Sequence, residues 1–154
     1  MAYTVTREVV DAFYDAYTTG NRDKLAALLH DDVLWTISGP VAVLSFCGQR
    51  RGKAQVLELG ATVLPNALRI LKVARDALII DGDRVATLNR LQGQRHGDNR
   101  MIAYRFAHFL RFEDDKVIEA VSIIDTFDAA EQMLGHSLPV HDEAQAATNN
   151  LVIV

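Results

Sequence analysis

The order of periodicities along the chain most constrains its fold, because helical spacing dominates the first 64 residues and strand alternation fills the next 60. Four long segments alternate between apolar and polar residues: 68–80, 84–94, 101–112 and 117–127. Short polar connections separate them, and Asp81-Gly82 is typical of a hairpin turn. Since such short links join antiparallel neighbours, these segments predict an antiparallel meander.

The first part of the chain predicts three helices and two short strands. The helices are expected over 7–19, 21–30 and 52–64, and the strands over 32–38 and 41–46. Thr6 and Gly20 are suited to cap the first helix, and Pro65 is expected to end the third. Helices followed by a meander indicate the α+β class, in which a curved sheet packs one face against helices. This order excludes a doubly wound α/β fold.

A chain of 154 residues with 49% hydrophobic residues is expected to form one globular core. We predict a single domain over 1–134 and a tail over 135–154. The tail ends in four apolar residues, Leu151 to Val154, which we expect to pack on the domain or on a partner copy. The 16 basic and 20 acidic residues give a net charge of −4, which argues against nucleic acid as a partner.

The single cysteine, Cys47, is interpreted as structural, because one thiol forms neither an intrachain disulfide nor a multi-cysteine zinc site. The five histidines lack the spacing of metal ligands, so no metal is expected. The N-terminus lacks the features of a signal peptide, and no apolar stretch is long enough to span a membrane. We therefore expect a cytoplasmic protein with no membrane partner.

Three stretches of the sequence together resemble a known family. They are Phe13 to Trp35, His108 to Val117, and the Ile124-Asp125-Thr126 tripeptide. They are similar to the SnoaL-like branch of the NTF2-like, or cystatin-like, superfamily, over roughly residues 7–134. The resemblance implies a cone-shaped α+β barrel, with N-terminal helices on a curved antiparallel sheet and a pocket between them. It does not fix the function, because this superfamily includes isomerases, cyclases, epoxide hydrolases and binding domains.

In such a cone, alternation along the last strand selects the residues that face the pocket. Val117, Glu119, Val121, Ile123 and Asp125 share one face, and its apolar members indicate burial. Asp125 would then lie at the pocket end in surroundings that raise its pKa, and it matches the family's acid/base Asp at the close of the last strand. The alternative is that Asp125 caps the helix expected to start near Phe127.

The preceding strand offers two further candidate catalytic residues. His108 is predicted to point inward, where it would exchange protons or orient Asp125. The alternative is a core histidine bonded to the backbone. Tyr104 is a candidate donor to a developing enolate, or is simply part of the core. Ala103, Ala107 and Phe109 are predicted to face outward.

Five residues are candidates for ligand binding: Trp35, Asn89, Phe106, Val121 and Ile123. Trp35 is expected to be buried, where it either stacks on a flat ligand or fills the wide end of the cone. Asn89 faces either the cavity or an exposed edge. Trp35, Phe106 and Ile123 would form the floor of the pocket.

These residues support two hypotheses for the function. The first is a cofactor-free isomerase or polyketide cyclase that moves a proton alpha to a carbonyl of a polyketide-, steroid- or aromatic-type compound. The second is a non-catalytic module that binds a small hydrophobic molecule or mediates dimerisation. Both accommodate a homodimer formed through the outer face of the sheet, which we predict from its small and aromatic side chains.

Overall fold

The computed structural model of the chain describes residues 2–139, and the predicted tail segment Leu151 to Val154 lies outside them. The helices are α1 (Arg7–Thr19), α2 (Arg22–Ala27), α3 (Lys53–Glu58), the π-helical turn η1 (Leu59–Val63), α4 (Leu64–Ala67) and α5 (Thr126–Leu134). The strands are β1 (Leu29–Ser38), β2 (Gly48–Arg51), β3 (Leu68–Asp81), β4 (Arg84–Arg95), β5 (Met101–Glu113) and β6 (Lys116–Ile124).

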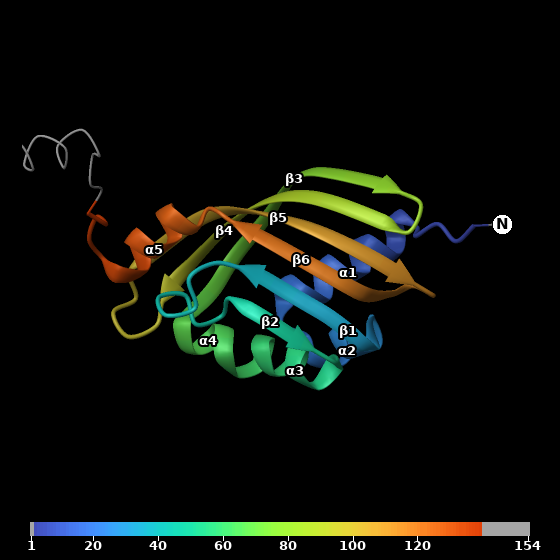
Figure 1. Ribbon diagram of the computed structural model, residues 1–154, viewed down its shortest axis with the longest axis horizontal. Coiled ribbons are helices and arrows are strands. Elements are labelled where there is room, and N and C mark those ends of the chain that lie inside the picture. The colour runs from blue at the N-terminus through green and yellow to red at the C-terminus, as the bar shows by residue number, and fades with distance from the viewer. Residues whose placement is uncertain (1, 140–154) are drawn as a thin grey trace, which may run out of the picture.

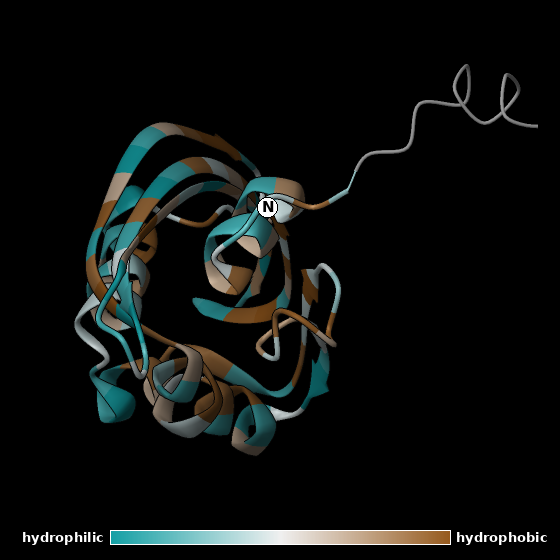
Figure 2. Cartoon of the chain, turned by 90° about the vertical axis from the view of Figure 1, so that its left-hand side faces the viewer, coloured by the Kyte–Doolittle hydropathy of each residue, from teal (hydrophilic) through white to brown (hydrophobic). Residues whose placement is uncertain are grey.

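The strands form one six-stranded sheet in the order β2-β1-β6-β5-β4-β3. Neighbours are antiparallel except β1 and β6, which pair in parallel, so the sheet is mixed. Helix α1 crosses behind the sheet, and α3 and α4 lie along its β2 end (Figure 1). The predicted α+β class and the four long strands are confirmed. Figure 2, viewed from the side of α5, shows how strongly the sheet curves.

The first two helices begin where the sequence predicts. The Thr6 side chain accepts a hydrogen bond from the Val9 amide, and Gly20 ends α1 with a φ of +65°, which glycine adopts without strain. Asn21 caps α2 through the Lys24 amide. That helix is shorter than predicted, because the chain turns extended at Leu29 and joins β6. His30 therefore belongs to β1.

Two predictions for the segment between β1 and α4 are wrong. Residues 41–46 form turns, and the short strand β2 follows them at Gly48–Arg51. The third helical region passes through η1 and Pro65 and ends at Ala67. Pro65 is tolerated because it lies in the first turn of α4, where its missing N–H is not required.

A β-bulge in β6 determines which of its side chains face inward. Phe112 pairs with Val117 and Arg111 pairs with Glu119, so Ile118 is an extra residue in β6. One extra residue inverts the alternation, and the buried positions beyond the bulge become Ala120, Ser122 and Ile124.

The predicted inward face of β6 is therefore wrong beyond Val117. Ile123 is 49% exposed, and Val121 lies on the outer face in a surface depression beside Phe109. Glu119 forms an ion pair with Arg111 on that same face, with 3.4 Å between Nε and Oε2. On β5, where no bulge intervenes before Arg111, the predicted alternation is confirmed, with Tyr104, Phe106 and His108 buried.

Candidate functional site

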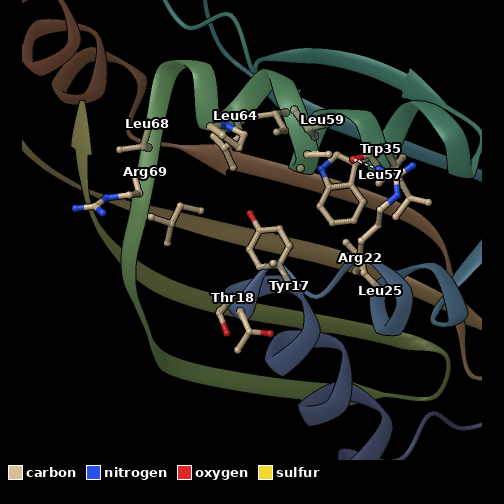
Figure 3. Close-up of a pocket in the computed structure, with 18 residues that line it drawn as sticks. Tyr17, Thr18, Arg22, Leu25, Trp35, Leu57, Leu59, Leu64, Leu68 and Arg69 are labelled. Atoms are coloured by element: carbon tan, nitrogen blue, oxygen red, sulfur yellow. Dashed lines mark hydrogen bonds between the residues drawn. The ribbon is translucent and has the colours of Figure 1, made fainter. Parts of the chain in front are cut away.

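A cavity of about 250 Å³ lies between α1, α2, β1, the α3–α4 region and the start of β3. Its walls are mostly apolar: Leu25, Trp35, Ile37, Val56, Leu57, Leu59, Leu64, Leu68 and Ile70 line it. Polar side chains, including Thr18, Arg22 and Arg69, also contribute to its lining (Figure 3). A concave apolar space with few polar groups is typical of a site for a small molecule.

Trp35 and Tyr17 form the aromatic part of the cavity wall. Their rings stack with centroids 6.0 Å apart, and Trp35 is only 1% exposed, as predicted. The Tyr17 ring reaches from α1 into the space between Trp35 and Leu68, with its hydroxyl directed away from α1 (Figure 3). Trp35 Nε1 is buried without a hydrogen-bond partner among residues 2–139. This wall offers flat apolar surface to a cyclic ligand.

A smaller recess of about 20 Å³ lies deeper in the sheet and shares Tyr17, Ile37 and Leu64 with the cavity. Phe46, Leu91, Tyr104, Phe106, Ser122 and Ile124 complete its lining. The predicted inward positions of Tyr104 and Phe106 are confirmed. Burial raises the pKa of both Tyr17 and Tyr104, so their phenol groups stay protonated at neutral pH.

His108 faces inward as predicted and is completely buried. Its Nδ1 lies 3.0 Å from the Tyr14 hydroxyl, which lies 2.5 Å from the Thr87 hydroxyl. Its Nε2 has no hydrogen-bond partner within the described part of the chain. Burial lowers the pKa of His108 to about 3, so the ring is neutral at pH 7.

The surroundings of His108 match the core-histidine alternative, with a hydroxyl in place of the expected backbone group. Its ring contacts Tyr17, Trp35 and Phe106, with centroids 5.5, 5.9 and 4.9 Å away. These three residues line the cavity or its recess, whereas His108 does not. The histidine therefore lies directly behind the wall.

Asn89 is fully buried and completes the polar chain that leads to His108. Its Nδ2 donates to the Thr87 hydroxyl at 2.8 Å, and its Oδ1 is unpartnered among residues 2–139. It lies at a different cleft from the main cavity, together with Tyr14 and the Arg75–Asp11 ion pair. Its predicted role in the pocket therefore lacks support from the geometry.

Asp125 lies outside the cavity. It is exposed, and its side chain accepts a hydrogen bond from the Asp128 amide at the start of α5. The predicted buried position is wrong, and the helix-capping alternative describes what the residue does. The bulge at Ile118 is the physical reason, because it turns Val121, Ile123 and Asp125 to the outside together.

Three residues of the site were not selected from the sequence. Tyr14 and Tyr17 lie three residues apart on α1, and this spacing places both on its inward face. A pair of inward phenols on an amphipathic helix is the signal that would have singled them out. Ser122 alternates with Val121 and Ile123, which were predicted to face inward, and it is buried in their place because of the bulge.

No carboxylate of the described residues lines the cavity or the recess. Two cationic side chains, Arg22 and Arg69, line the cavity. Arg22 donates a hydrogen bond to the Leu57 carbonyl at 3.4 Å, and Arg69 donates one to the Gln94 side chain. The local charge of the lining is therefore positive.

Residues 2–139 contain no group of three or more His, Cys, Asp or Glu side chains arranged to hold a metal ion. Burial raises the pKa of the Cys47 thiol to about 11, so the thiol is protonated at neutral pH. In the same range, no helix is long and apolar enough to span a membrane.

Comparison with known proteins identifies both family and fold relatives. The family model for the SnoaL-like domain matches residues 10–120. A proposed isomerase from Rhodopseudomonas palustris is 31% identical, with a TM-score of 0.77, covering 86% of this chain and all of that one. No curated protein matches.

Two more distant solved structures share the fold. An NTF2-like protein from Burkholderia xenovorans LB400 has a TM-score of 0.67 at 21% identity, covering 80% of this chain and 92% of its own. A protein from Catenulispora acidiphila with a ketosteroid isomerase-like fold, in complex with trimethylamine, has a TM-score of 0.68 at 18% identity. That match covers 86% of this chain and 95% of the other.

Proposed function

The chain belongs to the SnoaL-like domain family, and from that premise we propose that it binds a small, apolar cyclic molecule in the cavity beside Trp35 and Tyr17. The observation that carries the proposal is the cavity itself, about 250 Å³ and lined mainly by aliphatic and aromatic side chains. Its volume suits a compound of one to three fused rings. The stacked pair Trp35 and Tyr17 offers the flat surface that such a ring system contacts.

Trp35 is the only tryptophan, so its fluorescence reports directly on the cavity. We expect saturable changes in its emission on titration with bicyclic ketones such as 1-indanone. Ala61→Phe adds bulk to the cavity lining and is expected to weaken binding at least tenfold. Ala54→Phe places the same side chain at an exposed position of α3 outside the lining and serves as the control. Equal affinities for the two variants would contradict the proposal.

A second candidate function is the cofactor-free isomerisation or cyclisation of a polyketide-, steroid- or aromatic-type ketone. The 31% identity to a proposed isomerase favours it. His108 is the candidate base, since its Nε2 is unpartnered among the described residues and its cross-strand neighbour Ser122 lines the recess. The lowered pKa of His108 leaves a ring nitrogen unprotonated at neutral pH but also makes the ring a weak base. For this reason we rank ligand binding above catalysis.

Exchange of the alpha protons of 1-indanone in deuterium oxide, followed by NMR, tests this second function. If His108 abstracts the proton, the protein accelerates exchange over buffer, and His108→Gln reduces that acceleration at least tenfold. The exposed His96→Gln is the matched control. Saturable binding without accelerated exchange would leave the ligand-binding function standing and remove the catalytic one.

We also propose a homodimer formed through the outer face of the sheet. Two cross-strand rows are apolar there: Ile79, Ala86, Phe109 and Val121 in one, and Ala77, Leu88, Ala107 and Ile123 in the other. We call these eight residues the outer patch. Ile79 and Phe109 are 65% and 51% exposed, which is unusual for large apolar side chains that share one face of a sheet. A second copy is the occupant that self-complementary rows of this kind favour.

A further inference from the structure

The recess behind the main cavity combines a very small volume with three hydroxyl groups. About 20 Å³ is sufficient for a single water molecule or a single ligand oxygen atom. Tyr17, Tyr104 and Ser122 supply the hydroxyls, and the other six lining residues are apolar. The recess opens toward the cavity through the shared residues Tyr17, Ile37 and Leu64.

These hydroxyls come from three separate elements of the fold. Tyr17 projects from α1, Tyr104 from β5 and Ser122 from β6. Ser122 is directly opposite His108, and Tyr104 lies four residues before His108 on the inner face of β5. Within residues 2–139, none of the three side-chain hydroxyls has a hydrogen-bond partner, and none is among the fully enclosed unpartnered atoms, so each is accessible to a ligand atom or a water molecule.

The chemistry of the three groups determines what suits the recess. Each hydroxyl carries one proton to donate, and both phenols remain protonated at neutral pH because burial raises their pKa. Carbonyl and phenolate oxygens accept two or three hydrogen bonds and donate none. A ligand oxygen that accepts from these hydroxyls would replace the water that otherwise solvates them, so the recess suits an acceptor oxygen.

We propose that the recess is a subsite for one acceptor oxygen of the ligand, a ketone carbonyl or a phenolate, held by the hydroxyls of Tyr17, Tyr104 and Ser122. The proposal rests on the proposed function, because the ring system of the same ligand fills the apolar cavity. It narrows the ligand to cyclic compounds with an oxygen acceptor at one end. It also orients them, with the oxygen toward β5 and β6 and the remaining rings toward Trp35.

Matched ligands test the subsite. 1-Indanone and indane have the same bicyclic skeleton and differ in the carbonyl oxygen, and their dissociation constants are measured by calorimetry. The subsite predicts that Tyr104→Phe, Tyr17→Phe and Ser122→Ala each weaken 1-indanone binding about 3- to 10-fold, the loss of one neutral hydrogen bond. Indane binding should change less than 2-fold. Tyr3→Phe is the matched control, because it also removes a phenol hydroxyl but lies outside the lining of both the cavity and the recess.

The infrared carbonyl stretch of bound 1-indanone gives an independent readout. Hydrogen bonding in the recess lowers its frequency relative to the ketone in an apolar solvent, and Tyr104→Phe moves it back toward that value. An unshifted stretch, or variants that weaken both compounds equally, would mean that the recess holds a trapped water only and would overturn the subsite. Failure of both compounds to bind the wild-type protein would instead overturn the proposed function, and the subsite with it.

Discussion

The Tyr14 hydroxyl on α1 lies 3.0 Å from Nδ1 of His108 on β5, and this contact joins the first helix to the middle of the sheet. The same hydroxyl lies 2.5 Å from the Thr87 hydroxyl, which accepts a hydrogen bond from Asn89. The chain of four side chains is buried. Because isolated polar groups are costly inside a core, these contacts make the register between α1 and the sheet specific.

Removing one hydroxyl from this chain should destabilise the fold. Tyr14→Phe leaves His108 Nδ1 and the Thr87 hydroxyl each with one partner fewer, and we expect a loss of about 1 to 3 kcal/mol in the free energy of unfolding. Urea denaturation measures it. Tyr3→Phe is the matched control, because its hydroxyl bonds Asp115 at the surface and its loss should cost less than about 0.5 kcal/mol. Equal losses for the two variants would contradict a structural role for the buried chain.

The buried His108 also predicts a pH dependence of stability. Its folded pKa of about 3 lies below the value of about 6.5 expected in the unfolded chain, so the unfolded state binds the proton more tightly. The stabilisation is complete above about pH 6.5 and is lost as the pH falls toward 3. Between pH 7.5 and 4.5 the loss should reach about 2 to 3 kcal/mol.

Comparison with His108→Gln isolates this contribution. Urea denaturation of both proteins across pH 4.5 to 7.5 should give a shallower dependence for the variant, whatever its absolute stability. His96→Gln removes an exposed histidine and should keep the wild-type slope. If His108→Gln follows the wild-type slope as well, the ring is not held neutral in the folded state.

The sequence predicted the sheet well where charge marks one face of a strand. On β5, Arg105 and Arg111 alternate with Tyr104, Phe106 and His108, so the two faces are distinct and the inward residues follow directly. The caps of α1 were also predictable, because Thr6 and Gly20 act on backbone groups close to them in the sequence.

The same reasoning failed on β6, because both faces of that strand carry apolar residues. Val121 and Ile123 are as apolar as Ala120 and Ile124, so the pattern is compatible with either face inward. The bulge at Ile118 decides between them through its pairing with β5, and this depends on the assembled sheet. The Tyr14–His108 contact was equally inaccessible, because 94 residues separate its partners.

If the outer patch is the dimer interface, a charge placed within it should separate the dimer into monomers. Phe109→Glu places a charge at the centre of the patch, where burial against a second copy would leave that charge unpaired. Light scattering at micromolar concentration should give the dimer mass for the wild type and the monomer mass for the variant. Val41→Glu adds the same charge at an exposed position in the connection between β1 and β2 and should remain dimeric. A monomeric wild-type protein would remove the dimer proposal.

β4 packs so closely against the start of β3 that there is no room for a side chain at Gly93. This glycine pairs with Ile70 and Ile102, and a Cβ there would lie 2.7 Å from the Arg69 carbonyl oxygen and would clash with the Leu68 side chain. Backbone atoms cannot move aside as a flexible side chain does, so Gly93→Ala should lower the free energy of unfolding by about 1 to 3 kcal/mol. Gly60→Ala is the matched control, because a Cβ at Gly60 meets nothing within 4 Å and alanine favours the helix. That variant should be neutral or more stable by up to about 1 kcal/mol.

Gly93→Ala should also weaken the binding of 1-indanone, because the Leu68 side chain that must move lines the cavity. A stable variant that binds 1-indanone with unchanged affinity would show that this end of β3 shifts without consequence for the site.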